Sequence, residues 1–140
     1  MHGSVLRFER PGDPVGKERL PEERNAITRR VEIEGHKFFV TVGLYPDGRP
    51  GEIFIRTAKA GSTTAGFAHV FAESISVALH RGEPLDELCK RYVNTRFEPM
   101  GRTDDPNIPT VRSIVDYIFR WLAFKYKIKL DPNEKSLGDN

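Results

Sequence analysis

The sequence contains one cysteine, Cys89, among its 140 residues. A single thiol excludes an internal disulfide framework and a zinc site built from several thiolates. The four histidines are scattered, and no two of them stand at the spacing of metal ligands on a helix. We therefore expect neither a metal site nor a cofactor.

Long apolar runs and a strong charge of one sign are also lacking. No stretch of 18 apolar residues occurs, so we expect no membrane-spanning helix. The first residues lack the apolar segment of a secretory signal, which favours a cytoplasmic location. The formal net charge of +2 is too small to indicate nucleic-acid binding by itself. The composition and length are typical of one globular domain.

Both ends of the chain lack a sustained hydrophobic period. Residues 1–25 contain Pro11, Pro14 and Pro21 and many charges, so they are predicted to form an extended or flexible arm. Residues 131–140 are predicted to form a tail. The domain itself is expected over residues 26–130.

Three segments in the first half of the domain have the pattern of strands. Residues 28–34 and 37–44 are separated by Gly35-His36, which predicts a hairpin. Residues 45–51 are rich in turn formers and should reverse the chain into a third strand over residues 52–56. Consecutive strands of this kind predict an antiparallel meander.

Three helices are predicted in the second half. The first runs over residues 63–80 and ends before Gly82, and the second opens at Pro84. The third is capped by Thr110 or Ser113. The predicted buried residues of the first helix are Phe67, Val70, Phe71, Ile75, Ala78 and Leu79.

This order of elements predicts an α+β fold. We expect an antiparallel sheet of three strands with about three helices packed on one face. Residues 125–130 alternate lysine with apolar residues, so they are either a fourth, edge strand or a continuing basic helix end.

The segment between the third strand and the first helix is the main candidate for binding. A helix begins with N–H groups that have no partner inside the helix, and the helix dipole places partial positive charge there. Small and hydroxyl-bearing residues in this position favour binding of an anion. The candidate residues are Arg56, Lys59, Gly61, Ser62, Thr63 and Thr64.

A simpler interpretation of the same segment stays open. Ser62 or Thr63 could be an ordinary N-cap, with Gly61 an ordinary turn residue. Arg96 and Arg102 could complete an anion site, since a guanidinium binds phosphate through two hydrogen bonds. Alternatively, these two arginines belong to a solvated loop held by ion pairs with Glu98 and the nearby aspartates.

From about Arg19 to Tyr126 the chain resembles the TSCPD domain, a module near the C-terminus of cobalamin-dependent (class II) ribonucleotide reductases. The resemblance lies in five stretches of the sequence. They are residues 42–55, 59–63, 75–79, 95–103 and 113–123.

The resemblance implies a fold and an ancestry, whereas the residues argue against the reductase activity. The family's chemistry uses a large barrel, a thiyl radical and a redox pair of cysteines, and the cysteine-rich tail of many relatives has no counterpart after Cys89. We expect a stand-alone version of the domain that does not reduce ribonucleotides, so an enzymatic role is disfavoured.

Three functions remain as hypotheses. The first is a non-catalytic module that binds a nucleotide or another phosphate-bearing small molecule, and so senses or sequesters it. The second is an accessory protein that docks on a reductase or forms a homo-oligomer, for which Phe39 and Phe54 on the outer sheet face are the motivation. The third is binding of single-stranded nucleic acid through Lys125, Lys127 and Lys129.

Overall fold

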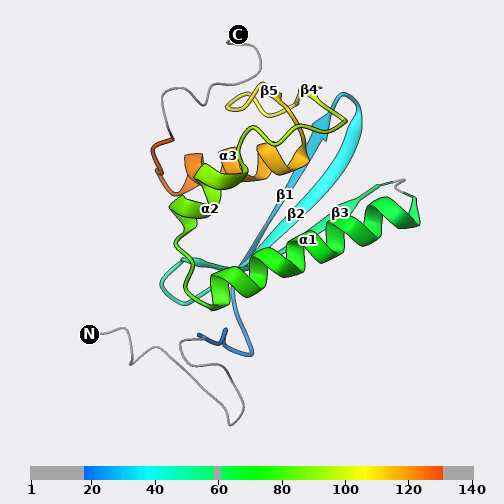
Figure 1. Ribbon diagram of the computed structural model, residues 1–140. Coiled ribbons are helices and arrows are strands. Elements are labelled where there is room, and N and C mark those ends of the chain that lie inside the picture. Colours follow the sequence, from blue (N-terminus) through cyan, green and yellow to red (C-terminus); the bar gives the residue numbers. More distant parts are fainter. Residues whose placement is uncertain (1–17, 59–60, 131–140) are drawn as a thin grey trace. The chain divides into compact units, whose positions relative to one another are not determined.

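The computed structural model describes residues 18–58 and 61–130 (Figure 1). The three main strands form an antiparallel sheet in the order β1-β2-β3, and two short strands, β4 and β5, form a separate ladder. The elements are β1 (Ala26–Ile33), β2 (His36–Leu44), β3 (Pro50–Thr57), α1 (Ser62–His80), α2 (Leu85–Tyr92), β4 (Gly101–Arg102), β5 (Thr110–Val111) and α3 (Ile114–Lys125). The predicted α+β class, with three main strands and three helices, is confirmed.

The hairpin between β1 and β2 turns one residue earlier than predicted. Glu34 and Gly35 have φ values of 47° and 82°, and they form the two-residue connection. Positive φ at both central positions is the geometry of a type I′ turn, whose twist matches that of the flanking strands. His36 consequently belongs to β2.

The chain divides into two compact units, each described here by itself. The described part of the first unit consists of residues 18–29, 40–56 and 61–83, and that of the second consists of residues 30–39, 57–58 and 84–130. Strands β1 and β2 contribute residues to both units. The remaining parts of the predicted arm and tail, residues 1–17 and 131–140, lie outside the described residues.

The turn between β2 and β3, in the first unit, is held by its own side chains. The backbone N–H of Arg49 donates to Asp47 Oδ1 at 3.1 Å, and the Arg49 guanidinium lies 4.6 Å from the ring centre of the buried Tyr45. Gly48, at φ 93°, supplies the left-handed residue that this reversal needs. The predicted reversal over residues 45–51 is confirmed.

Helix α1 is attached to the free edge of β3. The Ser76 hydroxyl accepts a hydrogen bond from the N–H of Ile53 at 2.9 Å and lies 3.2 Å from the Ile53 carbonyl. Both elements belong to the first unit, and the ribbon shows α1 running alongside β3 (Figure 1). An edge strand presents unpaired backbone groups. Ser76 satisfies the N–H of Ile53, and its one hydroxyl proton is shared between the Ile53 carbonyl and the Ala72 carbonyl of its own helix, the latter at 3.0 Å.

The prediction for the buried face of α1 is wrong in its first half. Phe67 is 74% exposed and Val70 is 56% exposed, whereas Ala72 and Ile75 are buried. Only the C-terminal half of α1 has buried residues on its apolar face. Phe54 on β3 is exposed as predicted.

The second unit has its core around α3. Ser113 caps this helix by accepting a hydrogen bond from the N–H of Asp116 at 3.0 Å, which settles the choice left between Thr110 and Ser113. The helix packs against α2, where the rings of Tyr92 and Phe119 lie 5.3 Å apart. Tyr117, Ile118 and Phe119 are fully buried.

The basic segment after α3 is not a strand. The helix ends at Lys125, and the N–H of Ile128 bonds to the carbonyl of Ala123 at 2.8 Å, with Lys127 left-handed at φ 57°. A left-handed residue, followed by an N–H that bonds back to the last helical turn, is a common way for a helix to end. Lys125, Lys127 and Lys129 are exposed, and nucleic-acid binding through them stays a prediction.

We expect Ser76→Ala to lower the free energy of unfolding by about 1–3 kcal/mol, because it leaves the backbone groups of Ile53 without their partner. Ser74→Ala is the matched control, since the Ser74 hydroxyl bonds only to the Val70 carbonyl of its own helix. Urea unfolding followed by circular dichroism would measure both variants. Equal stabilities would contradict the role of Ser76.

Candidate functional site

The first turn of α1 has free backbone donors. Gly61 is the N-cap residue and has no side-chain cap, and the N–H of Ala65 is the first to bond within the helix, to the Gly61 carbonyl at 3.0 Å. The N–H groups of Ser62, Thr63 and Thr64 therefore precede the helical hydrogen-bond ladder. The interpretation of Ser62 or Thr63 as an N-cap is wrong, because both lie inside the helix.

This turn is also accessible and carries no opposing charge. Every residue from 61 to 67 is exposed, and a Cβ atom placed on Gly61 or Gly66 would meet no atom within 4 Å. The first turn contains no acidic residue. The partial positive charge of the helix end is consequently open to an anion from solvent.

The other predicted site residues are distributed over the chain. Arg56 lies exposed on β3, in the same unit as α1, and it already interacts with another group. Lys59 lies outside the described residues. Arg96 and Arg102 belong to the second unit. The first unit thus holds Arg56 together with the first turn of α1.

Arg102 is tied to the β1–β2 turn rather than to Glu98. Its backbone N–H donates to Glu34 Oε2 at 2.7 Å, and its Nε lies 3.9 Å from the same oxygen. The guanidinium itself is 86% exposed. Arg96 is exposed as well. The sequence predicted that ion pairs hold this loop. Arg102 does lie near an acidic residue, but that residue is Glu34 and not Glu98 or a nearby aspartate.

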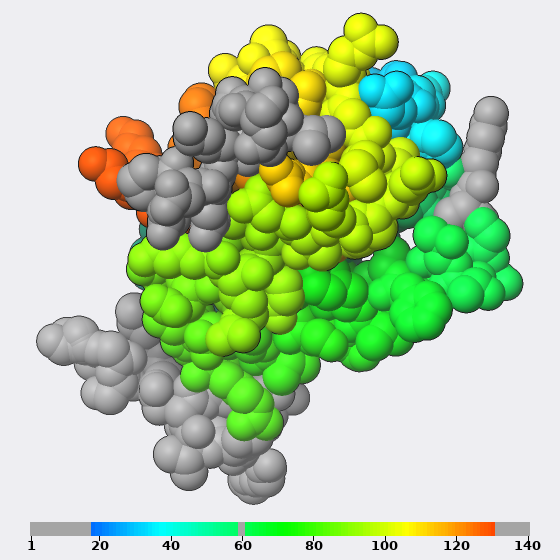
Figure 2. Space-filling model, turned by 45° about the horizontal axis from the view of Figure 1, so that its top comes forward, coloured from blue at the N-terminus to red at the C-terminus, as the bar shows by residue number. Residues whose placement is uncertain are grey.

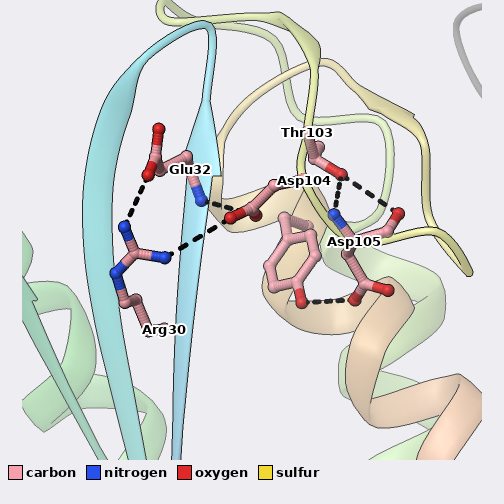
Figure 3. Close-up of polar contacts among 6 residues, drawn as sticks. Arg30, Glu32, Thr103, Asp104 and Asp105 are labelled. Atoms are coloured by element: carbon pink, nitrogen blue, oxygen red, sulfur yellow. Dashed lines mark hydrogen bonds and ion pairs between the residues drawn. The ribbon is translucent and has the colours of Figure 1, made fainter.

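Asp104 joins the same loop to β1 (Figure 3). Its Oδ1 accepts from the N–H of Glu32 at 2.9 Å, and its Oδ2 lies 3.4 Å from Nη1 of Arg30. The backbone adds an antiparallel bridge between Ile33 and Thr103. A carboxylate that accepts backbone N–H groups in this way orders a loop.

The neighbouring Asp105 points into the core. Its Oδ2 accepts a 2.6 Å hydrogen bond from the hydroxyl of Tyr117, the unlabelled tyrosine in Figure 3. Its Oδ1 accepts from the N–H of Asn107 at 3.0 Å. The side chains of Asp105 and Tyr117 are buried. These bonds satisfy the carboxylate, which explains its burial without any catalytic role.

Asp116 is a buried carboxylate of the second unit that accepts hydrogen bonds from both backbone and side-chain donors. It is fully buried and accepts from the N–H groups of Asn94 and Arg112 at 2.6 and 2.8 Å. Arg120 Nε donates to it at 2.8 Å and bonds Asn94 through Nη2. The spacing of Asp116 and Arg120 predicts their intrahelical pair, which is confirmed. Of the two backbone donors, Arg112 directly precedes the cap of α3, whereas Asn94 lies 22 residues away in sequence and carried no sequence signal.

Within the parts of the chain that the structure describes, no group of three or more histidine, cysteine or acidic residues could hold a metal ion. None of the described helices is long and apolar enough to cross a membrane. The first turn of α1 thus presents exposed backbone donors, whereas the buried carboxylates of Asp105 and Asp116 are hydrogen-bonded within the fold.

The model of the TSCPD domain matches residues 13–126 of the chain. The chain belongs to the TSCPD domain family. The matched range begins before β1 and ends directly after α3, so it contains every strand and helix of the structure.

Several curated relatives of the chain are vitamin B12-dependent ribonucleotide reductases. The protein of this name from Rhodopirellula baltica is 46% identical over 110 residues, which are 79% of this chain and 11% of the relative. Those from Streptomyces avermitilis and Streptantibioticus cattleyicolor are each 44% identical over 113 residues, 81% of this chain and 12% and 19% of the relatives. The chain therefore spans about a tenth to a fifth of these relatives. No solved structure matches it.

Cys89 should be unreactive in the folded TSCPD domain. It is fully buried on α2, and burial, followed by the charge of Asp86, raises the pKa of its thiol to about 12. At pH 8 the reactive thiolate is then scarce, so we expect a disulfide reagent to modify the native protein at least about 100-fold more slowly than the urea-unfolded protein. Similar rates in the two states would contradict the buried position.

Proposed function

We propose that this TSCPD domain is a non-catalytic module that binds a nucleotide, or another phosphate-bearing anion, at the first turn of α1. The supporting observation is the combination of an uncapped, exposed helix N-terminus with no acidic residue in its first turn. Three consecutive hydroxyl residues stand at this point, so side-chain donors accompany the free N–H groups.

The proposed role is recognition rather than chemistry. The backbone N–H groups of Ser62, Thr63 and Thr64 would donate to phosphate oxygens, with Arg56 on the adjoining strand as a source of full positive charge. The relatives named as ribonucleotide reductases make nucleotides the first ligands to test. A module of this kind would sense or sequester its ligand.

We expect calorimetric titration with inorganic phosphate and with mono-, di-, tri- and cyclic nucleotides to give saturable binding at sub-millimolar concentration. Ser62→Asp should raise the Kd at least about tenfold, because it places a negative charge among the donors. The same substitution should leave the helix intact or slightly more stable, since an acidic residue suits a helix N-terminus.

Ser74→Asp is the matched control. It makes the same chemical change at an exposed position of the same helix, three turns from the donors, and should leave the Kd within about twofold. Equal weakening by both variants would point to general charge repulsion and contradict a site at the first turn. Absence of saturable binding by the unaltered chain would end the proposal.

A second function, docking on a ribonucleotide reductase, is favoured by a different observation. The relatives contain the matched region as a small part of a much longer reductase, and large apolar side chains of this domain are exposed. We propose that the domain binds the remaining part of a reductase of this kind. Exposed apolar residues of this size are typical of protein-binding surfaces.

We expect the chain to bind the Rhodopirellula baltica reductase from which the segment matching residues 13–126 is deleted, with a Kd in the micromolar range or below. The intact reductase is the control, because its own tethered copy of the domain should compete and weaken binding at least about tenfold. Biolayer interferometry would measure both. No binding to the shortened reductase would contradict this second function.

A further inference from the structure

Helix α1 carries a second apolar stripe on its exposed side. It consists of Phe67, Val70, Ser74 and Val77, called here the α1 seam. Phe67, Val70 and Val77 are 74%, 56% and 46% exposed, and Ser74 is exposed as well. The atoms of α1 are visible at the surface in the space-filling view, where they are green (Figure 2).

The exposed side of α1 differs from an ordinary solvated helix face. From Ser62 to His80, Glu73 is the one residue that carries a formal charge at neutral pH. Helix α2 provides a comparison within the same chain, since four of its eight residues, Asp86, Glu87, Lys90 and Arg91, are charged. The absence of charge along the seam is therefore a property of this helix and not of the domain's surface in general.

The spacing of the seam suits packing against another helix or an apolar groove. Its members are three, four and three residues apart, so their side chains line one side of the helix over about three turns. This stripe lies apart from the buried residues Ala72 and Ile75 and from Ser76, which bonds β3. Helix α1 is thus attached to its own unit through Ala72, Ile75 and Ser76, and the α1 seam is a separate, exposed stripe.

Ser74, the polar residue of the seam, does not need a hydrogen-bond partner on the docked surface. The Ser74 hydroxyl donates to the Val70 carbonyl of the same helix at 2.9 Å. Burying a polar group is costly only when its hydrogen bond is lost, and this bond is internal to α1. The whole seam can therefore be covered by an apolar surface without leaving an unsatisfied group.

We infer that the α1 seam is the surface through which the domain docks on the remaining part of a vitamin B12-dependent ribonucleotide reductase. This inference rests on the second proposed function. The partner surface is expected to be an apolar groove or helix face without formal charge, because the seam offers no charge to pair.

The comparisons favour this occupant over a second copy of the chain. In the Rhodopirellula baltica relative, the matched region makes up 11% of the polypeptide, so most of that protein is available to cover the corresponding helix. The matched family region includes all of α1.

The test is Phe67→Ser, measured against the shortened Rhodopirellula baltica reductase by biolayer interferometry. We expect the Kd to rise at least about tenfold, because a buried aromatic ring is the commonest anchor of such contacts. Phe124→Ser is the matched control, since it removes another exposed ring, 61% exposed, from α3. The control should change the Kd less than twofold, and both variants should keep the melting temperature of the unaltered chain within a few degrees.

The outcomes separate the surface from the function. If the unaltered chain binds and Phe67→Ser binds equally well, the seam is not the docking surface and the docking function still stands. If the unaltered chain does not bind, the docking function itself fails. If light scattering shows a dimer of the unaltered chain that Phe67→Ser dissociates, a second copy covers the seam, and the reductase is not its occupant.

Discussion

The attachment of α1 to the edge of β3 is the interaction on which both functional proposals depend. Ser76 bonds the backbone of Ile53, and Ala72 and Ile75 are buried near it in the C-terminal half of the helix. The N-terminal half is consequently held in place without being covered. An ordered helix end with free N–H groups and an ordered apolar stripe both follow from this arrangement, since an unattached segment of this composition would lose them to conformational freedom.

In the second unit, buried and half-buried carboxylates order a long loop that has little regular structure. Asp116 accepts from the backbone N–H groups of Asn94 and Arg112, Asp105 accepts from Tyr117, and Asp104 ties the loop to β1. Each of these acids is hydrogen-bonded to its neighbours. Their arrangement explains how the domain accommodates two buried acidic side chains, Asp105 and Asp116.

Membership of the TSCPD domain family links the chain to ribonucleotide reductases, while the residue inventory limits what it shares with them. Cys89 is buried on α2, with its thiol held in the neutral form by burial. A single inert thiol supplies neither a redox pair nor a radical partner within this chain. The proposed recognition of an anion and the proposed docking through α1 both use surfaces that need no thiol.

The sequence by itself determined the order and approximate extent of the three main strands and the three helices. Hydrophobic period, turn residues and caps placed the strands, the helices and the Asp116–Arg120 pair, because these depend on residues close together in the chain. Tertiary structure alone decided which apolar face of α1 is covered, so Phe67 and Val70 were wrongly predicted to be buried. It also decided that Arg102 bonds Glu34 and that Asp116 accepts from Asn94. These contacts join segments that are far apart in the sequence, so no local sequence pattern predicts them.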